Sequence, residues 1–477
     1  MHKIALVLSL CLATSAIAAP AKKKVDPNRV AGARALGILK SSNWKPLFNG
    51  KDLTGWTGDT KGYVAKDGIL VCQKGAKILQ TAKDYSDYAF SFEFKLEESG
   101  NNGIGIRVPE NGHASREGME IQVLDHNGGK YQGEAEIAGK KRKVTWLKPW
   151  QMHGSIYGVY PAKTGYLKPA GEWNTETIVA IEDHIMVILN GAVIVDVHLD
   201  DVTPVDGTPH LGIRNKKGRI QFAGHNDHVE FRNIKLADFI PSRSTPSAKS
   251  DNTPPPGFTA LFNGKNLKGW KGLAHGNAPK RRALKGAELK KAQASADEVM
   301  REHWSVIDGV LTYDGKGRSL CTAKDFGDFE MYIDWKIPAG ADSGIYLRGT
   351  PQIQIWDPWK PQSHKGGEPT NAEEWVKAYR LGHNLGSGGL WNNRRARNMP
   401  TTVADKKPGE WNTFLIRMVG KNVSLWLNGK QILDRVELEN FWDRTRKEPL
   451  ARADQIELQH HGSELFFKNI YIRELPY

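Results

Sequence analysis

The sequence is poor in cysteine and in long apolar segments. It holds three cysteines in 477 residues, and two of them, Cys72 and Cys321, lie outside the apolar run at the N-terminus. An exported protein built on disulfides carries many more, so large apolar cores must stabilise this chain and the two thiols are expected to be single and buried. Beyond the N-terminus, no apolar run approaches the roughly 20 residues of a membrane-spanning helix. A membrane span is therefore excluded.

The N-terminus has the pattern of a secretory signal peptide. Lys3 precedes an apolar run, Ile4–Leu12, and the segment ends in Ala16-Ile17-Ala18-Ala19. A positive start, a short apolar centre and an A-x-A-like end direct export and are then removed. We expect residues 1–19 to be cleaved and the mature protein to be periplasmic or extracellular.

Positive charge exceeds negative charge, and the full chain carries a net charge of +14. Basic clusters of this kind can indicate nucleic-acid binding in an intracellular protein, but export makes that partner inconsistent with the sequence. Solvated loops are the favoured interpretation, and contact with an acidic polysaccharide or an anionic envelope surface is the alternative. The three clusters are Lys22–Lys24, Lys140–Lys143 and Arg394–Arg397.

The second half of the chain repeats the first half. LFNGKDLTGW begins at Leu47, and LFNGKNLKGW begins at Leu261. Further matches follow in the same order, which indicates duplication of a whole domain and not a short solenoid repeat. They are TAKDYSDY with TAKDFGDF, GIGIR with GIYLR, MEIQVLD with QIQIWD, GEWNT with GEWNT, LNG with LNG, and FRNI with FKNI.

These matches divide the mature chain into two domains. The first spans residues 44–239 and the second residues 257–477, and the segment 240–256 between them is rich in Pro and Ser, as extended linkers are. The second copy has an insertion near residues 271–303. Residues 287–303 are rich in Ala, Lys and Glu and have helical periodicity, so we expect a helical excursion there.

Elsewhere the sequence alternates in short stretches. Phe90, Phe92 and Phe94 alternate with polar residues, and Ile121 and Val123 alternate with Glu120 and Gln122. Period two is typical of strands with one buried face, and many short strands with Gly, Asn and Asp turns indicate a sandwich or barrel. We predict an all-β chain of two tandem concanavalin A-like jelly-roll β-sandwiches, with the helical insertion in the second.

The same alternation places a set of polar side chains on the face opposite the core. Such a face could hold a sugar, since adjacent strands lie only about 5 Å apart and their side chains can converge. Ion pairing between strands on a solvated face is the alternative. In the first domain the set is Glu93, Arg107, Glu120, Gln122 and His225, and its counterparts in the second are Asp334, Arg348, Gln352, Gln354 and His461, with Trp356 beside them.

Two aromatic residues in glycine-rich loops are further candidates. Tyr157 lies in GSIYG and Trp391 in GGLWN, and aromatic faces stack well on sugar rings. Asp125 and Asp357 each end a strand, where an aspartate can ligate a metal or cap a turn. The turn is favoured, because the sequence shows no decisive metal-ligand spacing. A metal-ligand role for these aspartates is the alternative.

The ordered motifs resemble the 3-keto-disaccharide hydrolase family. The string LFNG-K-[DN]-L-x-G-W, the strand ending Gly-Ile-x-x-Arg, the [EQ]-I-Q-x-x-D strand, GEWN, LNG and the final F-[RK]-N-I carry the resemblance, once in each half. It covers Trp44–Phe239 and Gly257–Leu475. The resemblance implies a concanavalin-like sandwich and cleavage of 3-keto-glycosides, by hydrolysis or by 1,2-elimination followed by hydration.

That chemistry requires a base, an acid and a group that stabilises an enolate. We take Glu120 as the base or acid and Glu93 or His225 as its counterpart. Arg107 would hold the substrate, stabilise the enolate or orient Glu120. No cofactor is certain, and a divalent metal is an alternative electrophile.

The second domain departs from this pattern because Gln352 stands where the first has Glu120. An amide cannot act as a general base, so the second domain would use Asp334 or His461, or would only bind sugar. The competing function for the whole chain is a non-catalytic, lectin-like carbohydrate-binding module, since β-sandwiches host both functions. A protein adhesion module is a third, weaker alternative.

Overall fold

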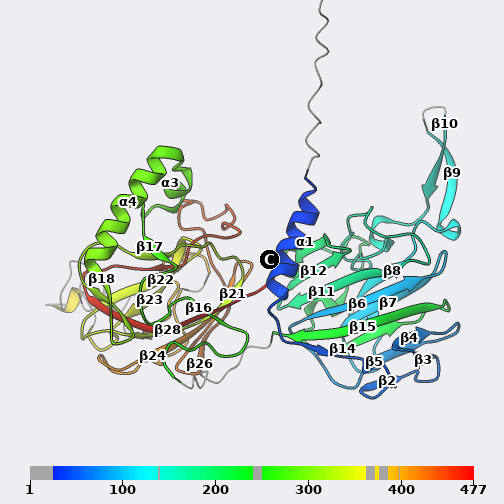
Figure 1. Cartoon of the computed structure of the whole chain (residues 1–477), viewed down its shortest axis with the longest axis horizontal. Helices are drawn as coiled ribbons and strands as arrows, with labels where there is room; N and C mark the ends of the chain where they lie inside the picture. Colours follow the sequence, from blue (N-terminus) through cyan, green and yellow to red (C-terminus); the bar gives the residue numbers. More distant parts are fainter. Residues whose placement is uncertain are drawn as a thin grey trace, which may run out of the picture.

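Two β-sandwiches lie side by side, with helix α1 (Pro27–Leu39) between them (Figure 1). The computed structural model describes residues 25–137, 140–239, 250–360, 371–374, 376, 385–396 and 398–477. The predicted signal peptide, residues 1–19, and the linker residues 240–249 lie outside the described residues.

The first sandwich pairs an eight-stranded sheet with a five-stranded sheet. The large sheet has the order β13-β12-β11-β6-β15-β4-β3, with β1 paired to β15, and the small sheet has the order β2-β5-β14-β7-β8. The strands are β1 (Trp44–Pro46), β2 (Trp56–Gly58), β3 (Tyr63–Lys66), β4 (Ile69–Cys72), β5 (Ile78–Thr81), β6 (Tyr88–Leu96), β7 (Asn101–Val108), β8 (Met119–Leu124), β11 (Asn174–Ile181), β12 (His184–Leu189), β13 (Ala192–His198), β14 (Arg219–Ala223) and β15 (Val229–Asp238).

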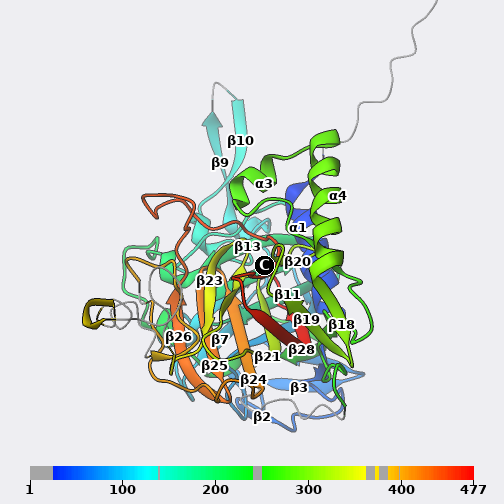
Figure 2. The same ribbon diagram turned by 90° about the vertical axis from the view of Figure 1, so that its left-hand side faces the viewer.

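A separate hairpin and several short helices complete this domain. The hairpin, β9 (Gln132–Ile137) with β10 (Lys140–Thr145), projects from the sandwich in both views (Figure 1, Figure 2). It carries the basic cluster Lys140–Lys143, which is exposed. The helices are α2 (Ala114–Glu117), η1 (Gly129–Tyr131), η2 (Pro149–Gln151), η3 (Leu199–Asp201) and η4 (Leu211–Arg214).

The second sandwich repeats the arrangement of the first. Its large sheet has the order β18-β19-β28-β21-β24-β25-β26 with β16 paired to β28, and its small sheet has the order β17-β20-β27-β22-β23. The strands are β16 (Thr259–Ala260), β17 (Trp270–Gly272), β18 (Trp304–Ile307), β19 (Val310–Asp314), β20 (Leu320–Thr322), β21 (Phe329–Lys336), β22 (Asp342–Leu347), β23 (Thr350–Trp356), β24 (Asn412–Val419), β25 (Asn422–Leu427), β26 (Lys430–Glu437), β27 (Glu457–Leu458) and β28 (Glu464–Glu474).

Two helices occupy the segment between β17 and β18, where the sequence has its insertion. They are α3 (Ala278–Ala283) and α4 (Gly286–His303), and α4 packs against β17 and β18. Asn277 caps α3 by accepting a hydrogen bond from the backbone N–H of Lys280, as N-cap residues do. Figure 2 shows α4 at the edge of the sandwich.

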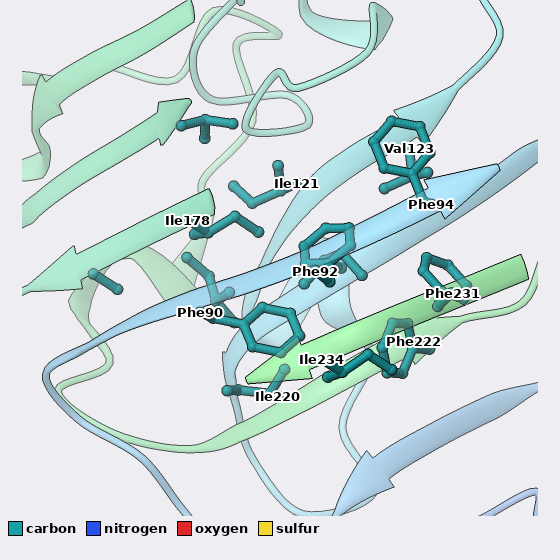
Figure 3. Packing of buried hydrophobic residues seen from close by; sticks show 14 of the residues in the cluster. Phe90, Phe92, Phe94, Ile121, Val123, Ile178, Ile220, Phe222, Phe231 and Ile234 are labelled. Atoms are coloured by element: carbon teal, nitrogen blue, oxygen red, sulfur yellow. The ribbon is translucent and has the colours of Figure 1, made fainter. Parts of the chain in front are cut away.

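Each sandwich has its own apolar core between its two sheets. In the first, Phe90, Phe92 and Phe94 of β6 meet Ile121 and Val123 of β8 (Figure 3). The second core is built in the same way from residues of the second copy, such as Phe329, Ile345 and Ile353. The alternation predicted for β6 and β8 is confirmed, so Glu120 and Gln122 face away from the first core.

A third cluster joins the domains. Ala35 and Leu39 of α1 pack on the outer face of the large sheet of the first domain, together with Val419 and Leu475 from the second. Arg417 is 1% exposed at this interface. Its guanidinium contacts Asp87 at 2.8 Å and Glu182 at 2.9 Å in the first domain, and Glu330 in the second. The domains are thus docked through apolar and ionic contacts.

The remaining expectations concern thiols and membranes. Cys72 and Cys321 are both free and buried, as predicted. Across the described part of the chain, no helix combines the length and apolar character that a membrane crossing requires.

Candidate functional site

The outer face of β8 carries the first candidate group, the carboxylate of Glu120. In the pairing of β7 with β8, Gly105 lies opposite Glu120 and Gly103 lies opposite Gln122. A Cβ added at Gly103 would lie 2.1 Å from Oε1 of Glu120. The carboxylate therefore lies across β7 in the space that a side chain at position 103 would fill.

A pocket of about 280 Å³ opens over this carboxylate. Its size is close to the lower end of small-molecule sites, about 300–1,000 Å³. Its walls come from β7, β8, the loops after β8 and the segment after β14. The lining residues are Asn101, His113, Ser115, Glu120, Gln122, Leu124, Tyr131, Trp146, Leu147, Gln151, Tyr157 and His225.

The side chains of Glu120 and His225 contact each other in this pocket. Nε2 of His225 lies 3.1 Å from Oε1 of Glu120. The side chain of Glu120 is 4% exposed and that of His225 is 37% exposed. The hydrogen bond with Glu120 raises the pKa of His225 above its usual value, against the opposing effect of burial. A carboxylate next to an imidazolium is an arrangement suited to proton transfer.

Neutral polar groups surround the pair. Nε2 of Gln122 donates to Oδ1 of Asn101 at 2.8 Å, which fixes the amide of Gln122 on the sheet face. The backbone N–H of Tyr157 donates to the carbonyl of Glu120 at 2.8 Å, and the Tyr157 hydroxyl accepts from Gln151 at 3.3 Å. Tyr157 thus borders the pocket with a half-buried aromatic ring.

Arg107 lies elsewhere, and the expectation that it joins Glu120 is wrong. Its side chain is 2% exposed, Nε donates to the carbonyl of Ser86 at 3.0 Å, and the guanidinium also contacts Asp87 and the carbonyl of Glu182. The reason is local. Arg107 has φ of +50° at the end of β7, where the register with β14 shifts, so the alternation of side chains breaks before it.

Glu93 also lies outside the pocket. It belongs to β6 in the large sheet, whereas Glu120 belongs to β8 in the small sheet. Its carboxylate accepts from Arg232 at 2.7 Å and Asn233 at 2.8 Å. The expectation that Glu93 and Glu120 share a sheet face is wrong, because alternation along a strand does not specify the sheet to which the strand belongs.

The second domain brings a related but different set together on β22 and β23. Gln352 donates to Gln354, and Gln354 donates to Asp342. Nδ1 of His461 lies 3.5 Å from Oδ2 of Asp342. Burial raises the pKa of Asp342, against the opposing charge of His461. The second domain therefore has a histidine–carboxylate pair too, but its carboxylate lies on the neighbouring strand.

Arg348 and Asp334 repeat the displacement of their first-domain counterparts. Arg348 has φ of +50°, and its guanidinium binds Asp328 and the carbonyl of Gly327. Asp334 lies on β21 of the large sheet and accepts from Asn469 at 2.7 Å. Neither side chain joins Gln352, so these two expectations are wrong for the same reasons.

The aromatic candidates of the second domain lie together. Trp356 is 3% exposed, and its indole N–H donates to the carbonyl of Gly386 at 2.8 Å. Trp391 packs edge-on against it with ring centroids 5.5 Å apart. Trp356 is thus covered by the loop that carries Trp391, and Trp391 is the more accessible of the two.

Sequence reasoning missed several residues of these sites. Asn101 and Asp342 occupy equivalent positions in the repeat, two residues before the Gly-Ile strand motif, and that alignment could have identified them. Glu457 on β27 is 6% exposed, and burial raises its pKa to about 7. Shifts of this kind gather at functional sites.

Around the first pocket, the described residues do not gather three His, Cys, Asp or Glu ligands within coordination distance. Asp125 accepts from the backbone N–H of Ser99 at 2.9 Å, and Asp357 accepts from that of Trp359 at 2.9 Å. Both aspartates stabilise turns in the structure.

The fold and the pocket define a β-sandwich enzyme with a histidine–carboxylate pair on the sheet face. Residues 43–237 and 257–473 each match the 3-keto-alpha-glucoside-1,2-lyase-like domain family. These matches cover most of the chain, which therefore belongs to this family and is a carbohydrate-active enzyme of the hydrolase or lyase type.

The chain is also similar to individual proteins. The 3-keto-disaccharide hydrolase of Bacteroides thetaiotaomicron is 25% identical over 277 residues, which are 49% of this chain and 85% of that protein. Two crystal structures of a proposed glycosyl hydrolase from Parabacteroides distasonis ATCC 8503 are each 25% identical with a TM-score of 0.35. They cover 41% and 46% of this chain and 100% and 99% of their own.

Proposed function

We propose that the first domain cleaves 3-keto-glycosides in the pocket that holds Glu120 and His225. The observation that carries this proposal is the 3.1 Å contact between the two side chains inside a sugar-sized pocket. The family and the 3-keto-disaccharide hydrolase relative support the same substrate class.

The chemistry follows from the ketone at C3 of the sugar. The ketone acidifies the hydrogen at C2, and a base removes it as a proton while the electron pair enters the enolate. The enolate then forms the C1–C2 double bond and expels the C1 oxygen, which takes a proton from an acid. Addition of water to C1, with return of the proton to C2, completes a net hydrolysis.

Glu120 is the base in this scheme and His225 is the acid. A carboxylate can accept the C2 proton, and the neighbouring imidazole in its protonated form can donate to the leaving oxygen. Gln122 and Tyr157 lie in the same pocket. Their amide and hydroxyl groups are suited to bind sugar hydroxyls or to stabilise the enolate, the role that sequence reasoning gave to Arg107.

For the second domain, two functions follow from its different residues. Gln352 replaces the base, which favours sugar binding without turnover. The Asp342–His461 pair favours a second, separate catalytic centre. Binding is the function we propose, because the hydrogen bond from Gln354 occupies Oδ1 of Asp342.

The test is turnover of a 3-keto-disaccharide by the full chain and by Glu120→Gln. Removal of a positioned base costs about 10²- to 10⁴-fold in rate, and the change is nearly isosteric, so the fold should survive. Glu93→Gln is the matched control and should leave the rate of turnover unchanged, since Glu93 lies on the other sheet. Equal rates for wild type and Glu120→Gln would contradict the proposal.

We further propose that the chain is exported and cleaved after residue 19, on the pattern of its N-terminus. Mass spectrometry of the protein purified from a host with a secretion system should find a mature chain that begins near Pro20. An unprocessed N-terminus in the cytoplasmic fraction would contradict this.

A further inference from the structure

A cluster of two histidines and one aspartate lies at the interface between the domains. His184 begins β12 and His198 ends β13, and the two are cross-strand partners. Asp328, in the second domain, completes the group. One donor atom from each residue lies within 4.8 Å of the other two. We propose that these three side chains bind one divalent metal ion of the zinc class.

The first argument is the way in which the two imidazoles are held. Nε2 of His184 lies 2.7 Å from Oδ1 of Asp196, and Nδ1 of His198 lies 3.3 Å from Oδ2 of Asp183. A histidine that binds a metal usually donates its other ring N–H to a carboxylate, which fixes the tautomer and the ring orientation. His184 has that hydrogen-bonded partner, and His198 lies beside Asp183 in an ion-pair contact, so the nitrogens left for a metal are Nδ1 of His184 and Nε2 of His198.

The second argument is a buried nitrogen without a partner. The side chain of His184 is 1% exposed, and its Nδ1 has no hydrogen-bond partner. A buried polar atom left unsatisfied is destabilising. If Nε2 carries the proton that Asp196 accepts, Nδ1 presents a lone pair, which is the form that coordinates a metal.

The third argument is the third ligand. Oδ1 of Asp328 accepts from Arg348 and from the backbone N–H of Gly420 at 3.0 Å. These bonds orient the carboxylate through Oδ1, so a metal ion would bind at Oδ2. Asp328 is 2% exposed, so its carboxylate has little access to bulk water.

The donor set defines the class of ion. Two neutral imidazoles and one carboxylate suit zinc and its neighbours in the transition series, and a water can complete a tetrahedral site. The side chain of His198 is 18% exposed, which leaves one side of the cluster open to solvent. Because the ligands come from both domains, the ion would tie the two sandwiches together.

Charge at the cluster does not oppose a cation. Each carboxylate also contacts an arginine: Asp183 with Arg435 at 3.0 Å, Asp196 with Arg452 at 2.7 Å, and Asp328 with Arg348. The charges of the three carboxylates and the three arginines cancel. The cluster therefore has excess positive charge only if a histidine is protonated. The rival state is a metal-free cluster in which a protonated imidazole takes the place of the ion.

The experiment uses the full chain after dialysis against a chelator. Titration with ZnCl₂ followed by calorimetry should show one equivalent bound, and Co²⁺ should give the visible absorption of a tetrahedral N/O site. His198→Gln and Asp328→Asn should each abolish this binding. Asp196→Asn removes no proposed ligand but changes the carboxylate that contacts His184 and Arg452, and it should weaken binding by about 10- to 100-fold.

The matched control is His303→Gln, because His303 also contacts an aspartate, Asp314 at 3.0 Å, but lies outside the cluster. It should bind Zn²⁺ and Co²⁺ as the wild type does. Circular dichroism of each variant shows whether it folds. If no ion binds to the folded wild type, or if folded His198→Gln still binds one equivalent with unchanged affinity, the proposal is overturned.

Discussion

The two domains share one architecture but place their acids differently. In the first domain the carboxylate is Glu120 on β8, and Asn101 on β7 is an amide; in the second, Gln352 on β23 is the amide and Asp342 on β22 is the acid. Each acid lies near a histidine, at 3.1 Å for His225 after β14 and at 3.5 Å for His461 after β27. Duplication has therefore kept a histidine–carboxylate pair while its acid has moved to the next strand.

Both sites contain an acid, and they differ in the strand that carries it. Glu120 extends over Gly103 into an open pocket, whereas Asp342 is held by Gln354. This difference in the surroundings of the two acids is the basis on which we propose turnover for the first domain and sugar binding for the second. The predictions that follow test this distinction.

The largest effect on the rate of cleavage is expected when the acid of the first domain is removed or is moved to the neighbouring strand. Glu120→Gln should lower the rate of keto-glycoside cleavage about 10²- to 10⁴-fold. The double variant Asn101→Asp/Glu120→Gln copies the second site and should not restore the rate, because Asp at position 101 would bind Gln122. Steady-state kinetics of both variants measure this. Restoration to near wild-type rates would show that the strand does not matter and that the second domain is itself a catalyst.

Removal of the ion pairs between the domains should lower the free energy of unfolding. Arg417→Ala leaves three carboxylates at the interface without their common partner, and breaking a buried ion pair costs about 3–5 kcal/mol. Lys421→Ala, which removes the exposed interdomain contact with Asp201, should cost less than about 1 kcal/mol. Denaturant unfolding gives both free energies. If the first site works alone, kcat of folded Arg417→Ala stays at the wild-type value.

A smaller effect is expected at the glycines under the two sites. Gly103→Ala places a Cβ 2.1 Å from Oε1 of Glu120 and should displace the carboxylate. A displacement of about 1 Å in a reacting group can cost about 10²-fold in rate. Gly344→Ala, which meets Gln352 at 2.7 Å in the second domain, should leave turnover unchanged. Equal losses in both variants would mean that both sites contribute to catalysis.

The sequence predicted the tandem sandwiches and the orientation of Glu120, Gln122 and His225, because repeats and period-two alternation are local signals. It did not predict the direction in which the side chains of Arg107 and Arg348 leave the sheet. A positive φ at the end of β7 and of β22 interrupts the alternation, and nothing in the residue type announces it. It also did not place Glu93, because the pairing of β6 with β11 and β15 is a long-range property.

The most modest effect concerns the titration of His225. Its hydrogen bond with Glu120 raises its pKa, so the imidazolium persists above the usual value near 6.5. The acid form is lost as pH rises through the raised pKa, so cleavage should decline on the alkaline side of about pH 6.5. The same sign holds for stability. The pairing stabilises the fold below the unfolded pKa, and this contribution disappears as pH rises through the folded one.

Glu120→Gln sharpens this test, since the amide can accept a hydrogen bond but carries no charge. The midpoint of His225, followed by the NMR signal of its Cε1 proton, should move to lower pH in this variant. Gln352→Glu is the matched change in the second domain and should leave the midpoint of His225 where it is. An unchanged midpoint in Glu120→Gln would show that the carboxylate does not hold the proton on His225. Another acid would then have to be found for the leaving oxygen.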